Sequence, residues 1–191
     1  MSEITPQEFI ENLLRGTNRD GIEELLEFMK EQGFYTAPAS TKFHGAYEGA
    51  LAEHSINVYN NAVAIAKSLS FEWFVDNADS IGIVSLLHDL GKAGQYGKPY
   101  YIENILKSGR SNAQPYKTND DLLFIPHEVA SVVEASRFIR LTEDEQRAIL
   151  WHNGLYGAFK YDIQGKETPL YMVLHFADMW ASRVDEREVK E

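Results

Sequence analysis

Residues 80–92 read SIGIVSLLHDLGK, and this stretch decides the fold class. It is apolar almost all round until it reaches His88 and Asp89, a pattern typical of a helix buried among other helices. An ionised carboxylate buried beside an imidazole is costly unless a cation or strong hydrogen bonds compensate. The stretch therefore predicts an all-α fold in which one helix ends in a chemically active pair.

The rest of the chain is also helical in pattern. Thr5-Pro6 with Glu8, and Thr142 with Glu145, are capping boxes at helix starts. Glycines or prolines mark the other helix ends. We expect six or seven helices and no convincing strand pair, with helices at about residues 6–16, 20–33, 47–69, 80–90, 126–138, 142–154 and from 168 onward.

Composition limits the functional classes. The chain has 191 residues, which fits one domain, and it contains no cysteine, so disulfides and thiolate metal sites are excluded. Its start lacks a basic segment followed by an apolar run, and no apolar run approaches the ~18 residues of a membrane span. We therefore expect a cytoplasmic protein without a membrane partner.

The formal net charge of −11 disfavours broad contact with nucleic-acid phosphates. We expect a small substrate, or a polyanion held mainly by metal, and no binding of duplex nucleic acid. The long polar segment 91–126 has little periodicity, and such a loop is usually functional or mobile. Four basic residues of this segment offset the global repulsion locally: Lys98, Lys107, Arg110 and Lys117.

The histidines carry weight only in combination. His54 lies between Leu51 and Val58 on one apolar helical stripe, and an isolated histidine of this kind is more often a packed core residue. The adjacent pair His88 and Asp89 can offer an imidazole nitrogen and a carboxylate oxygen to one ion near a helix end. Imidazole nitrogen and carboxylate oxygen suit Mn, Fe, Co, Ni or Zn, and suit Ca less well, while Mg is a further candidate.

The motifs resemble the HD superfamily of metal-dependent phosphohydrolases. That family has a pattern H…HD…D on separate helices of an all-α bundle. Here it is matched by GALAEHSINVYNNA, by LLHDLGK and by HFADMWASRVDE, and the resemblance covers residues 42–185. KFHGAYEGALAEH is similar to the opening of the HD domain in bacterial 3′-5′ exoribonucleases. PYYIEN, PHEVASV and WHNG resemble uncharacterised HD hydrolases of bacteria and phages.

The resemblance implies a set of metal ligands. His54, His88, Asp89 and Asp178 match the ligands of a first ion, and Asp89 commonly bridges two ions. His127 and His152 match the extra pair of the binuclear subgroup, which includes the HD-GYP phosphodiesterases. The GYP tripeptide is absent here, which removes support for a cyclic dinucleotide.

Alternatives to these ligand roles stay open at this point. Asp178 could instead pair with Arg183 or Arg137. His127 and His152 could surround a single ion without touching it. His175 lies on the same helical face as Asp178, and we expect it to support or pack rather than ligate.

Residues beside the metal set are candidates for catalysis and substrate binding. Lys92 matches a position that often contacts a substrate phosphate, although it could be a solvated residue. His44 could donate a proton to the leaving group or contact a phosphate, or could make an ordinary hydrogen bond. The loop tyrosines, Tyr100 and Tyr116 above all, offer surfaces for a nucleobase or simply cover the bundle. The predicted catalytic residues are Asp89, Lys92 and His44.

We therefore expect a single domain, with residues 1–36 as a helical extension, 42–185 as the HD core and 91–126 as a lid. The extension either contacts a second copy in a homodimer or lengthens the bundle. The implied reaction is cleavage of a phosphomonoester or phosphodiester in a nucleotide or short oligonucleotide by water that metal activates. Two other functions fit the same ligands: an HD-type di-iron oxygenase, and a non-catalytic module that binds a nucleotide.

Overall fold

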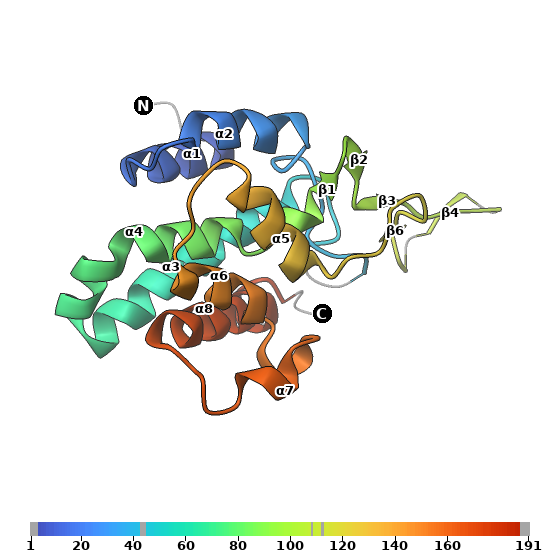
Figure 1. The fold of residues 1–191 in the computed structure, drawn as a ribbon. Coiled ribbons are helices and arrows are strands. Elements are labelled where there is room, and N and C mark those ends of the chain that lie inside the picture. Colours follow the sequence, from blue (N-terminus) through green and yellow to red (C-terminus); the bar gives the residue numbers. More distant parts are fainter. Residues whose placement is uncertain (1–3, 43–44, 108, 112, 188–191) are drawn as a thin grey trace.

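Figure 1 shows the computed structural model, which describes residues 4–42, 45–107, 109–111 and 113–187. Over these residues the chain forms eight α-helices, which confirms the all-α prediction. The helices are α1 (Pro6–Gly16), α2 (Ile22–Glu31), α3 (Ala50–Leu69), α4 (Phe71–Leu87), α5 (His127–Ser136), α6 (Glu143–Trp151), α7 (Lys160–Ile163) and α8 (Pro169–Trp180).

The centre of the bundle is formed by α3, α4, α6 and α8. Helix α3 packs along α4 and also against α8, while α6 packs against α8 and α4. The second half of α4 is buried on every side, from Ile81 to Leu87, as its sequence predicts. Each fully buried Leu or Ile contributes about 1.5–3 kcal/mol through the hydrophobic effect, so this helix anchors the core.

Two predicted helix starts were placed incorrectly. Helix α3 begins at Ala50 rather than near Tyr47, because Gly49 has a left-handed φ of 85° and ends the preceding turn. Helix α4 begins at Phe71 rather than near Ser80, and Ser70 caps it by accepting a hydrogen bond from the Trp73 amide. The first nine residues of α4 are amphipathic and partly exposed. Their helical pattern is weaker than that of the more hydrophobic end, and the sequence interpretation therefore missed them.

The expectation of no strand pair was wrong. Three short antiparallel pairs lie between α4 and α5, and Figure 1 shows them projecting from one side of the helices. Each strand has only two or three residues, too few for the alternating pattern that identifies a strand in sequence. The pairs are β1 (Gly94–Gln95) with β2 (Lys98–Pro99), β3 (Tyr101–Glu103) with β6 (Tyr116–Thr118), and β4 (Ile105–Leu106) with β5 (Gly109–Arg110).

Three single helical turns complete the description. A 3₁₀ turn, η1 (Leu90–Lys92), follows α4 directly, and a second, η2 (Gly154–Tyr156), follows α6. A π-helix, η3 (Ala181–Asp185), continues α8. None of the helices in the described segments has the length and hydrophobicity that a membrane crossing requires.

A buried ion pair joins the N-terminal helices to the core. Glu145 is fully buried at the start of α6 and pairs with Arg19, which follows α1. It also accepts hydrogen bonds from Ser80 Oγ (2.7 Å) and from the Thr142 amide (2.8 Å). Burial works to raise the pKa of Glu145, but these partners outweigh it and the pKa is lowered.

Replacing Arg19 by Ala should destabilise the fold by about 3 kcal/mol, because the Glu145 carboxylate stays buried without its cation. The pKa of Glu145 is lowered on folding, so its stabilisation is present above pH 4.5 and is lost as the pH falls below that value. Chemical denaturation at pH 7 and pH 3 measures both effects.

Arg15→Ala, which breaks only exposed ion pairs, is the matched control and should leave the denaturation midpoint unchanged. An equal effect of the two substitutions would contradict this interpretation.

Candidate metal centre

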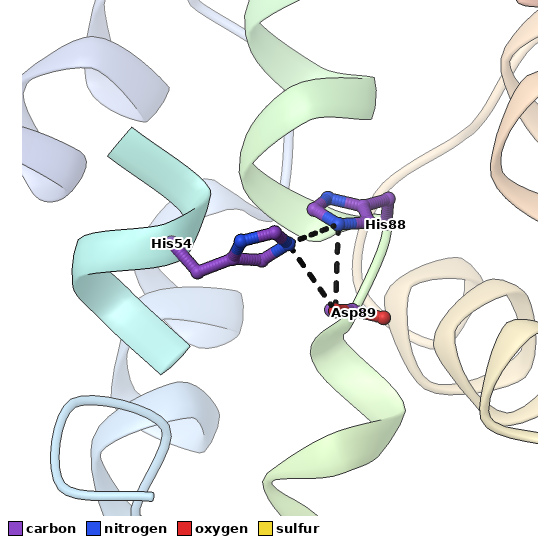
Figure 2. A group of neighbouring side chains, drawn as sticks. All are labelled: His54, His88 and Asp89. Atoms are coloured by element: carbon purple, nitrogen blue, oxygen red, sulfur yellow. Dashed lines mark hydrogen bonds and ion pairs between the residues drawn. The ribbon is translucent and has the colours of Figure 1, made fainter. Parts of the chain in front are cut away.

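Asp89 is the centre of a buried cluster of histidines and acids. It caps η1 with φ −107° and ψ 15°, so the chain leaves the α-helix between His88 and Asp89. Because of this break, the two adjacent side chains turn to the same point, as Figure 2 shows together with His54 from α3. The stretch LLHDLGK thus brings a histidine and a carboxylate into one site.

The two carboxylate oxygens of Asp89 face different histidines. Oδ2 lies 3.4 Å from His88 Nε2 and 3.7 Å from His54 Nε2. Oδ1 lies 3.3 Å from His127 Nε2 and 3.5 Å from His152 Nε2. Despite these short distances, Oδ1 makes no hydrogen bond of acceptable geometry within the described part of the chain. A buried carboxylate oxygen in this state is suited to a cation.

Asp178 closes the cluster from α8. Its Oδ1 lies 3.2 Å from His54 Nε2. The alternative of an ion pair with Arg137 or Arg183 is not what the described residues show, since Arg137 pairs with Glu134 and Arg183 lies over Tyr156. Burial works to raise the pKa of Asp178, but the neighbouring histidines outweigh it and lower the pKa strongly.

The donor atoms of these residues form three overlapping groups of three. In each group the atoms lie within 4.8 Å of one another, the separation that ligands around one ion require. The groups are His54, His88 and Asp89; Asp89, His127 and His152; and His88, His152 and Asp178.

Each histidine is oriented through its Nδ1 atom. His88 and His152 are the C-terminal caps of α4 and α6, and their Nδ1 atoms lie 2.9 and 2.7 Å from the carbonyls of Ser85 and Ile149. A carbonyl only accepts, so both Nδ1 atoms carry the proton and both Nε2 lone pairs face the cluster. This is the tautomer that a metal ligand needs.

The other two histidines are oriented by carboxylates. His54 Nδ1 lies 2.9 Å from Glu186 Oε1, and His127 Nδ1 lies 3.4 Å from Glu128 Oε2. The Nε2 atoms of His54 and His88 are only 3.3 Å apart. At this distance one proton can be shared as an N–H···N hydrogen bond, and because both nitrogens also face Asp89 Oδ2, a divalent cation can take the place of that proton.

Three supporting residues were not assigned by the sequence interpretation. Glu186 stands beyond the π-helix, whose extra residue changes the direction in which later side chains point. Asn153 Nδ2 donates to Glu128 Oε1 at 3.0 Å and lies 3.2 and 3.1 Å from the Nε2 atoms of His127 and His152, so in this structure it contacts the ring nitrogens that also face Asp89 Oδ1. Glu128, the neighbour of His127 in the sequence, is 4% exposed and belongs to the same network. Only its position next to His127 gave a signal in the sequence.

Glycine allows α5 to approach the centre. A Cβ on Gly91 would lie 2.5 Å from the His127 carbonyl oxygen, so no larger residue fits without moving α5. The Gly91 amide also donates to Ser131 Oγ at 2.9 Å. The glycine of LLHDLGK therefore holds His127 beside Asp89.

Lys92 lies inside the centre and is not a solvated residue. Its Nζ is 2.6 Å from Asp89 Oδ2, and its side chain is only 16% exposed. Burial works to lower its pKa, but the Asp89 carboxylate outweighs this and raises it. His175 joins none of the ligand groups found among the described residues, and its Nδ1 lies 2.7 Å from the His152 carbonyl.

The remaining predicted residues lie outside the ligand groups. His44 falls outside the described residues. Tyr100 is 8% exposed and packs edge-on against Tyr101 at 4.8 Å, while Tyr116 lies under Arg110 at 5.1 Å. Burial raises the pKa of Tyr101, in the segment 91–126, and the nearby charges of Lys92 and Asp89 act on it in opposite directions.

A large hollow lies away from this cluster. About 1300 Å³ in volume, it lies between the α1–α2 turn, α5 and α6, and none of the six clustered residues lines it. A hollow of about 70 Å³ does touch the cluster at His152 and Asp178. Of these two hollows, only the smaller one gives access to the clustered donors.

Comparison with known families agrees with this geometry. The family model described as HD domain matches residues 51–188, which is more than half of the chain. The chain therefore belongs to the HD-domain family, whose members are mostly metal-dependent phosphohydrolases. Comparison with curated proteins and with solved structures gave no match.

Metal binding should become tighter as the pH rises. Burial works to lower the pKa of His54, but the bonds to Asp178 and Glu186 outweigh it and raise the pKa to about 10. The metal-free protein thus holds a proton on His54 at pH 7, and a ligating imidazole must lose it. The apparent affinity for Mn²⁺ should rise about tenfold per pH unit below pH 10 for each proton displaced. Calorimetric titrations in two buffers with different ionisation enthalpies count the protons. Equal affinity at pH 6 and pH 8 would show that this proton is not displaced.

Proposed function

We propose that the protein is a metal-dependent phosphohydrolase that cleaves a phosphomonoester or phosphodiester in a nucleotide or short oligonucleotide. The observation that supports this most strongly is the division of the Asp89 oxygens, Oδ2 toward His54 and His88, Oδ1 toward His127 and His152. A carboxylate with its two oxygens directed to two ligand groups is arranged to bridge two ions. We assign His54, His88, Asp89 and Asp178 to one ion, and Asp89, His127 and His152 to the other.

Transition-metal ions in such a site would acidify water and neutralise charge on a phosphoryl group. The protein residues would position and balance these charges. Glu186 and Glu128 hold the imidazoles of His54 and His127 in the ligating orientation. Lys92 places a fixed positive charge beside Asp89, where it would attract a phosphate oxygen.

The substrate is proposed to be small. The net charge of −11 disfavours contact with a long phosphate backbone. The hairpin segment 91–126 comes close to the centre at Tyr100 and Tyr101, and we propose that it covers a bound nucleotide as a lid. The exposed cations of this segment, such as Lys107, would then face the substrate rather than bulk solvent.

A panel of nucleoside monophosphates, cyclic nucleotides and short oligonucleotides, assayed with Mn²⁺, tests the proposal. We expect hydrolysis of at least one compound, and loss of that hydrolysis when a chelator is added. Lack of turnover across the panel, together with visible iron–oxygen absorption in anaerobically purified protein, would favour an oxygenase instead. Tight, salt-sensitive binding of long duplex would contradict the proposed substrate size.

A further inference from the structure

A small hollow connects the ligand cluster to the C-terminal end of α8. It has a volume of about 70 Å³, and His152 and Asp178 form part of its wall. The wall also includes Tyr156, Ser182 and Arg183, none of which belongs to the ligand groups. A cation and an aromatic ring therefore share a cavity with two of the proposed metal ligands.

Arg183 has an unusual environment for a cation in this acidic protein. Its guanidinium carbon lies 4.5 Å from the centre of the Tyr156 ring, so the two groups interact through a cation–π contact. No acid in the described part of the chain forms an ion pair with it, whereas Arg15, Arg19, Arg137 and Arg147 all pair with glutamates. Its planar donors are available to a ligand.

The local backbone explains this placement. The π-helix η3 follows α8 directly and begins three residues after Asp178. Such π segments occur frequently at functional sites, because they redirect side chains that a regular helix would place elsewhere. Here η3 contributes Ser182 and Arg183 to the hollow, and the residue after its end, Glu186, reaches His54.

We propose that Arg183 and Tyr156 form a phosphate-binding subsite beside the metal centre. Arg183 donates hydrogen bonds to non-bridging oxygens of the substrate phosphoryl group, and Tyr156 positions the guanidinium by contact with its face. A guanidinium matches two phosphate oxygens at once, which an ammonium cannot do. This inference rests on the proposed function, since it assigns the group that the centre would act on.

The dimensions of the hollow restrict what it holds. A hollow of about 70 Å³ has room for a small polar group such as the oxygens of a phosphoryl group. The rest of the substrate must extend outward. Tyr156 is 71% exposed, so part of its ring remains accessible to that outer portion. Arg183 would then meet the phosphate beside Asp178, while Lys92, which does not line the hollow, adds positive charge beside Asp89.

The test is calorimetric binding of inorganic phosphate to the Mn²⁺-loaded protein, together with steady-state kinetics on the best substrate of the panel. Arg183→Ala should weaken phosphate binding about ten- to a hundredfold, the usual effect of losing a charge-assisted hydrogen bond. Arg183→Ala should also raise KM for the substrate and leave the metal content unchanged.

Three further variants separate charge from geometry. Arg183→Lys should restore only part of the phosphate affinity. Tyr156→Phe should keep the wild-type affinity, and Tyr156→Ala should lose it. The matched control is Arg147→Ala, because Arg147 also lies over an aromatic ring, Trp151 at 5.5 Å, but outside this hollow.

The outcomes separate this inference from the proposed function. Unchanged phosphate affinity and KM in Arg183→Ala would overturn the subsite even if the wild-type protein hydrolyses phosphoesters. Equal losses in Arg183→Ala and Arg147→Ala would also overturn it, since they would reflect a general charge effect. Phosphate binding that depends on Arg183 in a protein without phosphoesterase activity would support the subsite and contradict the proposed reaction.

Discussion

Asp89→Asn should abolish metal binding and reduce phosphoester hydrolysis at least about a thousandfold. The substitution keeps the shape of the side chain but removes the charge that faces His54 and His88 on one side and His127 and His152 on the other. In the wild-type protein, Mn²⁺ should raise the melting temperature, because it binds only the folded state. In Asp89→Asn this rise should disappear.

The control for this prediction is Asp185→Asn. Asp185 is an exposed acid near the same end of the molecule and accepts a hydrogen bond from Asn61 Nδ2 at 2.7 Å. It belongs to none of the ligand groups formed by the described residues, so its metal content and activity should match the wild type. Full metal content in Asp89→Asn, measured by elemental analysis, would be incompatible with a bridging carboxylate.

His127→Ala should reduce the metal content from two ions to one. His127 faces only Oδ1 of Asp89, while the group around Oδ2 keeps all its donors. We expect hydrolysis to fall by about a hundredfold or more, because the charge on the transferred phosphoryl group is then balanced by a single ion. Elemental analysis and a calorimetric titration with Mn²⁺ measure the stoichiometry directly.

His175→Ala provides the comparison. His175 lies in the same region and binds the His152 carbonyl through Nδ1, but it presents no donor to the ligand groups. Its removal should leave the stoichiometry at two. A wild-type protein that binds one ion only, or a His127→Ala variant that still binds two, would show that the second group of ligands was assigned incorrectly.

Part of the site could be predicted from the sequence because its chemistry conflicts with its surroundings. His88 and Asp89 end an apolar helix, and such polar groups in a core need a compensating partner. The spatial grouping of six residues on or beside five helices, by contrast, follows from how α3, α4, α5, α6 and α8 pack, and no local sequence pattern predicts that packing. The resemblance to a known family supplied that link.

The residues that orient the histidines could not be predicted in the same way. Glu186 depends on the π-helix, which changes the direction of the side chains after residue 181. The groups that orient His88 and His152 are the backbone carbonyls of Ser85 and Ile149. Every residue has such a carbonyl, so the identity of these two residues gives no signal in the sequence. The short strands of the segment 91–126 were missed because pairs of two or three residues leave no periodic pattern.

The most direct test of the metal centre is anomalous X-ray scattering from crystals of the Mn²⁺-loaded protein. We predict two peaks on either side of the Asp89 carboxylate, with the Nε2 atoms of His54 and His88 at about 2.0–2.3 Å from one and those of His127 and His152 at a similar distance from the other. Absence of any peak among these side chains, or peaks only at exposed surface carboxylates, would contradict the account.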